Sequence, residues 1–467
     1  MRLWLAAALV VCACASAAGG DGSGGFVSLF NGKNLDGWVV AGNPEGFTVV
    51  DGRLHSEGGR GGQWIHTTER YGNFVLRMEW MLSQVGNSGV FIRTGEGGGG
   101  FEVQLLAPWT PPRDDLHCTG SIYGHVAANP RPDETPLRWR QLQVTAAYKR
   151  ITVKMDGVTC AEADYDQVPS MKDLALDGYV GMQDSHTGPG EWVEFRKIEI
   201  RDLDQDPGFL CDGLAGDDSA VRRTAYDAAI RLGPPMVLPL LDLLKRGGAP
   251  ARHAAEMALT RIVANASAPG DDEAARAARE ALVAGLTEEG GNAAPSRACA
   301  ARLLGLIGQD DWRTVAALRR ALAEGGPVSE AALGAMQVIP GRPLTASLML
   351  ALRRADESLQ PGLALALGAR KDEAAIPMLS RMAREGSQNV RLAAVQALGA
   401  IGGARVLPVL REVGAGAPDQ VRHVAVDALL SILKSGELNR DQRIAVVRLA
   451  HELAVTDREK AAVDAAR

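Results

Sequence analysis

The chain has 467 residues and a formal net charge of -6 at pH 7. This length exceeds what one ordinary hydrophobic core supports, so the sequence predicts two or three domains. The slightly acidic balance excludes a general electrostatic attraction to nucleic acid or to acidic lipids, and we expect no nucleic-acid partner.

Residues 1–17 have the features of a secretory signal peptide, with one positive charge, a short apolar run and small residues at its end. Neither this run nor any later segment is long and apolar enough to span a bilayer. Two processing routes are open: lipid attachment at Cys12 or Cys14, or ordinary cleavage after residues 15–17. We expect export to the periplasm or cell envelope, with membrane contact only through an added lipid anchor. The glycine-rich residues 18–25 predict a flexible tether.

Residues 26–205 predict an antiparallel β-sandwich. Short runs with period-two alternation of apolar and polar residues, such as 74–82, 151–155 and 193–200, are separated by turn residues. Helical segments are not expected between them. Strands this frequent are typical of two antiparallel sheets packed face to face.

Alternation along two of these strands indicates a polar face. Side chains at positions i and i+2 lie on one face of a strand, so Glu102 and Gln104 point away from the apolar residues beside them. By the same rule Arg93 shares a face with Phe91. We expect an aromatic platform beside a guanidinium group, suited to a sugar ring and its hydroxyls. The alternative is an ordinary solvent-exposed polar sheet face.

Five short motifs occur in order along this domain, each at an expected strand or strand turn: Ser28–Trp38, Asn87–Arg93, Phe101–Leu105, Thr119–Gly124 and Glu194–Ile200. Together they resemble the 3-keto-disaccharide hydrolase family, also described as 3-keto-glucoside 1,2-lyase and 3-keto-2-hydroxy-glucal hydratase. The resemblance covers about the first 200 residues. It implies a concanavalin-like or laminin-G-like jelly roll whose concave sheet and rim loops hold a sugar.

The resemblance also implies a particular chemistry. Oxidation of a sugar at C3 acidifies the C2 proton, so a base can remove it and the glycosidic oxygen on C1 can leave by elimination. Water then adds back, which gives net hydrolysis. The protein must supply a base with a pKa near neutral, a donor or cation for the enolate oxygen, and an acid for the leaving group.

A comparison with laminarinase-type glycosidases narrows the mechanism. Those enzymes carry Glu-x-Asp-x-x-Glu on one strand, but here Gln104 occupies the Asp position and Ala107 that of the second Glu. Ordinary retaining hydrolysis requires two carboxylates that flank the scissile bond. We therefore do not expect a retaining glycosidase of that type.

Glu102 and His186 are the expected acid and base. The segment 180–186 resembles the family's Gly-x-Gln-Asp-His sequence with one extra Ser, which leaves open whether Asp184 or His186 fills the family position. Glu102, Asp184 and His186 could also bind a divalent metal, since oxygen and imidazole ligands suit Mn, Zn or Ca. His117 and His125 are further imidazoles of the right type. The expected substrate-binding residues are Asn87, Phe91, Arg93, Gln104, Trp109, Tyr123, Gln183 and Asp184.

Four cysteines follow the signal segment, and their spacings match no zinc-binding pattern. Export permits disulfides. Cys118 and Cys160 lie in the same predicted domain and could pair. We expect free thiols or a single structural bridge among Cys118, Cys160, Cys211 and Cys299.

Residues 212–467 predict a HEAT-like helical solenoid. Similar helix starts recur mostly 30 to 32 residues apart, at 222, 252, 297, 329, 360, 391 and 422. Several of these positions are Arg, which could form a basic ridge, but in a slightly acidic chain we expect an exposed charged face instead. Glycines are expected to close the first helix of a pair, at Gly233, Gly308, Gly368 and Gly402. Small Ala positions are expected to let the helices pack closely.

Two functions follow from these features. In the first, an exported enzyme acts on a 3-keto-glycoside, and the solenoid binds a protein partner. In the second, the sandwich is a carbohydrate-binding module without catalysis, and the protein is an adaptor. The pair Trp139-Arg140 favours the second, because the resemblance implies Trp-Asn there. The motifs around Asn87, Glu102 and Tyr123 favour the first.

Overall fold

The computed structural model describes residues 25–61, 63–98, 100–111, 114–288, 293–435 and 438–466. The chain divides into two compact units between Asp206 and Pro207. The expected signal peptide and most of the glycine-rich tether lie outside the described residues. Among the helices of the described ranges, none has the length and apolarity needed to cross a membrane.

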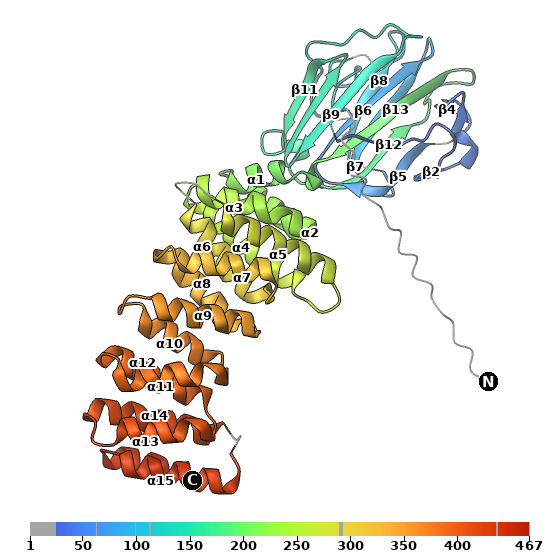
Figure 1. The fold of residues 1–467 in the computed structure, drawn as a ribbon. Helices are drawn as coiled ribbons and strands as arrows, with labels where there is room; N and C mark the ends of the chain where they lie inside the picture. The colour runs from blue at the N-terminus through green and yellow to red at the C-terminus, as the bar shows by residue number, and fades with distance from the viewer. Residues whose placement is uncertain are drawn as a thin grey trace, which may run out of the picture. The chain divides into compact units, whose positions relative to one another are not determined.

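The first unit is an antiparallel β-sandwich of two sheets (Figure 1), which confirms the predicted fold class. The eight-stranded sheet has the order β11 (Val158–Asp164), β10 (Arg150–Met155), β9 (Arg140–Ala147), β6 (Phe74–Leu82), β13 (Trp192–Asp202), β4 (Arg53–Glu57) and β3 (Thr48–Val50), with β1 (Val27–Ser28) paired to β13. The five-stranded sheet has the order β2 (Trp38–Ala41), β5 (Trp64–Tyr71), β12 (Gly178–Gln183), β7 (Asn87–Thr94) and β8 (Phe101–Leu106).

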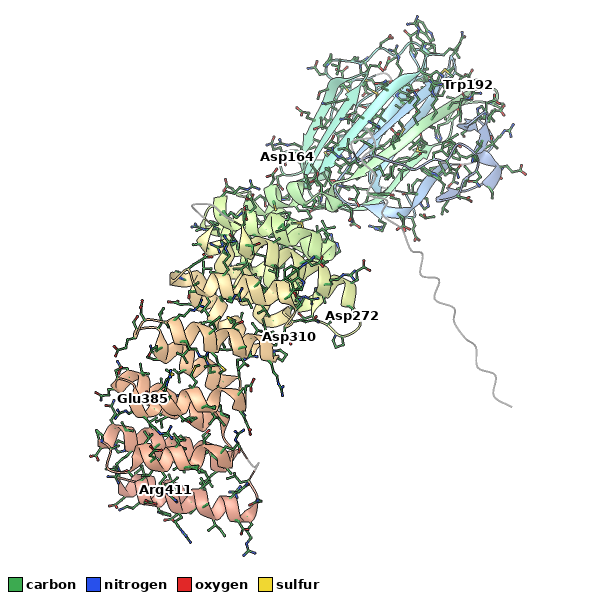
Figure 2. All side chains as sticks on the ribbon, viewed as in Figure 1. Asp164, Trp192, Asp272, Asp310, Glu385 and Arg411 are labelled. Atoms are coloured by element: carbon green, nitrogen blue, oxygen red, sulfur yellow. The ribbon has the colours of Figure 1, made fainter. Side chains whose placement is uncertain are left out.

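Alternation along the strands puts one face of each sheet into a common core. In β6 every second side chain from Phe74 to Leu82 is buried in this core. From the five-stranded sheet, Val90 and Ile92 of β7 and the apolar residues of β8 enter the same core. Burial of such apolar surface is the main stabilising contribution to a sandwich, at about 25 cal/mol per Å². The intervening side chains of β6 are left on the outward face. Figure 2 labels Asp164 and Trp192, which mark the end of β11 and the start of β13.

The second unit is entirely helical and stacks helix upon helix (Figure 1), as predicted for the solenoid. Its helices are α1 (Pro207–Ala215), α2 (Ser219–Leu232), α3 (Val237–Arg246), α4 (Ala249–Ala266), α5 (Asp272–Thr287), α6 (Ala294–Ile307), α7 (Trp312–Leu322), α8 (Gly326–Val338), α9 (Arg342–Arg354), α10 (Gln360–Ala369), α11 (Ile376–Glu385), α12 (Gln388–Ile401), α13 (Leu407–Gly414), α14 (Asp419–Lys434), α15 (Arg440–Leu453) and α16 (Asp457–Ala465). Short 3-10 turns occur at η1 (Pro44–Gly46), η2 (Pro169–Met171), η3 (Leu203–Gln205), η4 (Pro234–Met236), η5 (Glu373–Ala375) and η6 (Ala404–Val406).

Small residues let neighbouring helices of the stack approach closely. A Cβ atom on Gly368 of α10 would lie 2.6 Å from the Cα of Ala397 in α12. A Cβ on Gly399 of α12 would lie 2.7 Å from the Cα of Ala428 in α14. The prediction that Gly368 closes its helix is therefore wrong, because it packs inside α10. The other three expected glycines do follow their helices: Gly233, Gly308 and Gly402.

The recurrent Arg of the repeats makes contacts within the stack. Arg297 donates from Nε to the carbonyl of Leu286 in the last turn of α5, at 2.8 Å. Arg422 donates to the carbonyl of Leu453 at the end of α15, at 3.2 Å. Carbonyls in the last turn of a helix lack partners inside that helix, and a cation there also matches the helix dipole. These two arginines thus cap neighbouring helices. The sequence predicted neither this role nor these contacts, because it considered only an exposed charged face or a basic ridge.

All four cysteines of the described chain are free and buried. Burial raises the pKa of the Cys160, Cys211 and Cys299 thiols to about 11. The pKa of Cys118 is also raised by burial. Of the two expectations, free thiols match the structure and a bridge between Cys118 and Cys160 does not.

Candidate functional site

The candidate site lies on the outward side of the five-stranded sheet, called the outer face below. Strand register brings its members together: Phe91 of β7 pairs with Glu102 of β8, and Gly89 pairs with Gln104. On the other side of β7, Gly181 of β12 pairs with Phe91 and with His66 of β5. The outer face comprises Trp64, His66, Asn87, Gly89, Phe91, Glu102, Gln104, Gly181 and Gln183.

Two glycines on the outer face make room for large side chains. A Cβ atom at Gly89 would lie 2.6 Å from both Cγ and Cδ of Glu102, so the Glu102 side chain lies across the bare backbone of Gly89. A Cβ at Gly181 would lie 2.8 Å from Cε3 of Trp64, so the indole likewise lies across Gly181. Real Cβ atoms do not approach other atoms this closely, so Glu102 and Trp64 can keep these positions only while residues 89 and 181 are Gly.

The Glu102 carboxyl titrates near neutral pH. Burial raises its pKa from the ordinary 4.5 to about 7, because the half-buried site disfavours the charged form. A carboxyl with this pKa is present as both acid and base at physiological pH, which suits general acid–base catalysis. The prediction that Glu102 is an acid or base of the site is thus consistent with its surroundings.

An aromatic row crosses the outer face next to Glu102. The rings of Trp64 and His66 stack with their centroids 4.6 Å apart, and Trp64 meets Phe91 edge-on at 5.7 Å. Tyr179 continues the row beyond His66 at 4.7 Å. Trp64 and His66 are buried, at 8% and 7% exposed, and Phe91 and Tyr179 are the half-buried members of the row. Exposed aromatic surfaces of this kind pack against the apolar face of a sugar ring. Of this row only Phe91 was predicted from the sequence as a sugar contact, although Trp64 and His66 alternate with the core residue Ile65.

Gln104 holds Asn87 in place. Its Nε2 donates to Oδ1 of Asn87 at 2.8 Å, and the Gln104 residue is only 1% exposed. Asn87 is half-buried on the same face. Gln104 was expected to bind substrate, but its burial suits it to orient the Asn87 amide, which then remains for a ligand hydroxyl.

A loop after β8 adds Tyr123 and His117 to the site. The backbone N–H of Tyr123 donates to the carbonyl of Glu102 at 2.9 Å, so Tyr123 lies beside Glu102 like a residue of an added strand. Its ring centroid is 4.4 Å from that of His117. His117 in turn directs Nδ1 to the Asp114 carboxylate, at 2.6 and 2.8 Å from the two oxygens. The sequence marked His117 only as one of the imidazoles of the right type and favoured His186 over it; the Asp-x-x-His spacing was the further signal.

Arg93 lies away from the outer face, so its predicted role in substrate binding is wrong. It adopts a φ of +52°, which breaks the alternation of β7 and turns the side chain inward. The guanidinium donates twice to the carbonyl of Gly72, at 2.9 and 2.7 Å. It also donates to the carbonyl of Tyr148 at 2.7 Å and to the hydroxyl of Tyr165 at 2.9 Å. Arg93 is therefore a structural residue of the sandwich.

Arg93→Met is expected to lower the free energy of unfolding of the sandwich by about 3 kcal/mol, because it removes buried charge-assisted hydrogen bonds and leaves their acceptors without this donor. Urea unfolding followed by tryptophan fluorescence measures the change. Arg150→Met is the matched control: the Arg150 side chain is 69% exposed and lies 4.0 Å from Asp164. Such surface pairs contribute little. Equal stability of the two variants would contradict the structural role of Arg93.

The remaining predicted residues lie around the outer face with different exposures. Gln183 faces outward opposite Trp64. The His186 backbone N–H donates to the carbonyl of Asn87 at 2.7 Å, but the His186 side chain is 67% exposed. Burial raises the pKa of Asp184, whose Oδ2 accepts from the backbone of Gln63. Trp109 is strongly exposed in the loop after β8.

The proposed metal ligands do not form a cluster. Within the described ranges, no three side chains of His, Cys, Asp or Glu lie close enough together to hold a metal ion. Glu102, Asp184 and His186 are thus not assembled as a ligand set, and a metal requirement stays a prediction.

Arg140, the departure from the family pattern, lies on the other sheet. It starts β9 and forms ion pairs with Asp133 and, at 3.0 Å, with Asp156. The preceding Trp139 packs its ring under the Arg196 guanidinium at 3.9 Å. Neither residue belongs to the outer face, so this departure leaves the outer face intact.

Two hollows of the structure lie elsewhere. One of about 970 Å³ is lined by helices α7 to α10, and one of about 490 Å³ lies over β6, β9, β10 and β13 of the eight-stranded sheet. The first is lined by leucines and alanines together with charged side chains such as Arg319, Arg320 and Arg354, and the second mainly by charged and amide side chains. Neither contains the half-buried carboxyl of the outer face. The chemistry therefore favours the outer face as the candidate site.

Family models match parts of both units of the chain. Residues 25–201 match the family model described as a 3-keto-alpha-glucoside-1,2-lyase-like domain, and residues 345–430 match the HEAT repeat model. A 3-keto-disaccharide hydrolase of Bacteroides thetaiotaomicron is 24% identical over 234 residues, which cover 38% of this chain and 79% of the relative.

Solved structures also align with parts of the chain. A protein of Parabacteroides distasonis, described provisionally as a glycosyl hydrolase, is 24% identical with a TM-score of 0.34, over 38% of this chain and 99% of the other. A β-glucanase of Bacillus licheniformis is 13% identical with a TM-score of 0.27, over 38% of this chain and 98% of the other.

Proposed function

We propose that this chain, whose residues 25–201 match the 3-keto-disaccharide hydrolase type of domain, cleaves 3-keto-glycosides on its outer face by elimination followed by hydration. The observation that carries the proposal is the Glu102 carboxyl. It is half-buried, its pKa is about 7, and it lies beside an aromatic row. Ala107, at the place of a second catalytic carboxyl in laminarinase-type enzymes, is buried and apolar.

In the proposed reaction Glu102 removes the proton from C2 of the sugar. The electron pair of the C2–H bond forms a C1=C2 double bond, and the C1–O bond breaks with its electrons on the departing oxygen. That oxygen takes up a proton. Water then adds its oxygen to C1, and a proton returns to C2. One water is consumed, and the products are a 3-keto sugar and the free aglycone.

The test is incubation of the full chain with 3-keto-trehalose or a 3-keto-glucoside beside the unoxidised glycoside. We expect cleavage of the 3-keto substrate and little of the unoxidised one, because only the ketone acidifies the C2 proton. Parallel samples with chelator and with added divalent metal test the proposed cation requirement. Sugar binding without cleavage of any 3-keto substrate would instead support the adaptor.

Turnover is expected to rise with pH through about 7, as Glu102 converts to its base form. The raised pKa of Glu102 means that the base form is scarce below pH 6 and predominant above pH 8. A pH profile of kcat/KM on a 3-keto-glucoside measures the pH range over which turnover rises. A base limb near the ordinary carboxyl pKa of 4.5 would show that Glu102 does not act as the base.

The remaining parts of the proposal concern placement and partners. HEAT repeats are generally protein-interaction elements, and we propose that the helical unit binds a protein partner. The N-terminal residues support export as a further part of the proposal, with or without lipid attachment.

A further inference from the structure

The proposed elimination still needs a residue that donates a proton to the departing glycosidic oxygen. Glu102 can serve only one of the two proton transfers at a time, and the glycosidic oxygen needs its own proton donor as it leaves. The acid must be a titratable group on the same side of the sheet as Glu102. His186 was the expected second group, but 67% of its side chain is exposed and its Nδ1 lies 3.7 Å from Asp184. That contact is too long to orient the ring.

The His117 loop is fixed onto the edge of the sheet beside Glu102. Thr119 Oγ1 donates to the carbonyl of Leu106 at 2.8 Å and accepts from its N–H at 2.9 Å. The carbonyl of Leu116, directly before His117, accepts from the N–H of Gly124 and from Oγ of Ser121, at 3.1 and 2.9 Å. The loop therefore positions His117 firmly at the outer face.

The His117 ring is held from two sides. Tyr123 packs edge-on against it at 4.4 Å, and the Asp114 carboxylate holds Nδ1 at 2.6 Å. The hydrogen bond to His117 lowers the pKa of Asp114, so this carboxylate stays charged. With Nδ1 bound to Asp114, Nε2 is the nitrogen left for a ligand, and 26% of the side chain is exposed. A carboxylate that fixes one imidazole nitrogen leaves the other for proton transfer.

A chain of contacts links Glu102 to His117. Tyr123 bonds across to Glu102 as a residue of a neighbouring strand would, at a strand spacing of about 5 Å, and the His117 ring centroid is 4.4 Å from that of Tyr123. Two groups that each hydrogen bond to neighbouring atoms of a substrate lie within about 9 Å of each other. A sugar ring held between Glu102 and His117 would present C2 to one group and the oxygen on C1 to the other. His125 is different, because it bonds Ser170 at 2.7 Å and packs against the core residue Phe101.

We propose that His117, oriented by Asp114, is the acid that protonates the leaving oxygen and then the base that activates water. This inference rests on the proposed function. In elimination Glu102 gains the C2 proton, and the His117 imidazolium gives its proton to the departing oxygen. In hydration the neutral His117 takes a proton from the water whose oxygen bonds to C1, and Glu102 returns its proton to C2. Both side chains are then restored, with no other reactant.

The test compares leaving groups of different basicity. A 3-keto-glucoside of an alcohol has a poor leaving group that needs a proton, whereas a 4-nitrophenyl 3-keto-glucoside releases a stable phenolate without one. We expect His117→Gln to lower turnover of the alkyl glucoside about a hundred- to ten-thousand-fold. Turnover of the nitrophenyl glucoside should fall less than about tenfold. His253→Gln, an exposed His of α4, is the control and should match the parent on both substrates.

Asp114 is a positioning residue in this scheme. Asp114→Asn should show the same dependence on leaving group as His117→Gln, with a smaller loss on the alkyl glucoside, because the imidazole remains but is less well oriented. Equal losses on both substrates would assign His117 a binding or structural role and overturn the inference. So would unchanged turnover by His117→Gln.

The outcomes separate this inference from the proposed function. If the parent cleaves 3-keto-glucosides and His117→Gln keeps the parental dependence on leaving group, only the role of His117 is overturned. If the parent cleaves neither 3-keto substrate, the proposed function fails and the role of His117 fails with it. Thermal unfolding of each variant should match the parent, which shows that any loss of turnover arises in the site.

Discussion

Glu102→Gln is expected to lower turnover of a 3-keto-glycoside about a hundred- to ten-thousand-fold and to stabilise the sandwich above pH 7. The first effect follows from loss of the group that removes the C2 proton. The second follows from burial, which raises the pKa of Glu102 to about 7 and so makes its charged form unfavourable in the folded state. The nearly isosteric amide keeps the packing over Gly89 and carries no charge.

The gain in stability expected for Glu102→Gln grows as pH rises. Because the pKa in the folded state exceeds the ordinary 4.5, the parent is most stable below that value and loses stability as pH rises through about 7. The advantage of Glu102→Gln should be small at pH 5 and approach about 3 kcal/mol at pH 8.5, since each pKa unit corresponds to about 1.4 kcal/mol.

Denaturant unfolding of both proteins at pH 5 and pH 8.5, followed by tryptophan fluorescence, measures this difference. Most tryptophans of the described residues lie in the sandwich, so the signal reports on the right unit. A variant that is less stable than the parent at pH 8.5 would contradict the burial of a destabilising carboxylate. A variant with parental turnover would remove Glu102 from the reaction.

Gly89→Ala is expected to reduce turnover by about a hundredfold or more while the sandwich stays folded. The added Cβ would lie 2.6 Å from Cγ and Cδ of Glu102, so the carboxyl must leave its present position. A base displaced by about an ångström loses most of its advantage. The side chain can swing toward solvent, so the cost to stability should be modest.

Gly97→Ala is the matched control for this variant. A Cβ at Gly97 meets no atom within 4 Å. Steady-state kinetics on a 3-keto-glucoside, together with a thermal melt of each protein, measure both effects. Parental turnover by Gly89→Ala would mean that the position of the Glu102 carboxyl over Gly89 is not required for the reaction.

The fold was predictable because it depends on local patterns. Period-two alternation marked β6, β10 and β13 clearly, since each has one face in the core. The same rule placed Glu102 and Gln104 on one face, which the pairing of β8 with β7 confirms. Helical periodicity and recurrent starts likewise predicted the second unit, because each helix pair repeats the same packing.

The site was only partly predictable because it depends on contacts between distant residues. A single positive φ at Arg93 reversed the direction of its side chain, and alternation alone does not reveal such a break. The buried state of Gln104 depends on Asn87 in the next strand. His117 gains its significance from Tyr123 and Asp114 only when the loop folds against β8. The pKa of Glu102 depends on the surroundings that these segments create.

Cleavage of a 3-keto-glucoside by the full chain in D₂O tests the central claim most directly. Elimination moves the C2 proton to the Glu102 carboxyl, whose proton exchanges with solvent, and hydration then returns a proton from this carboxyl to C2. Early turnovers should therefore leave deuterium on C2 of the released 3-keto sugar, as read by NMR or mass spectrometry. The product incubated alone and with Glu102→Gln corrects for spontaneous exchange. A released sugar that keeps its original C2 hydrogen, together with an unchanged rate when C2 of the substrate carries deuterium, would mean direct hydrolysis at C1 and would contradict the proposed elimination.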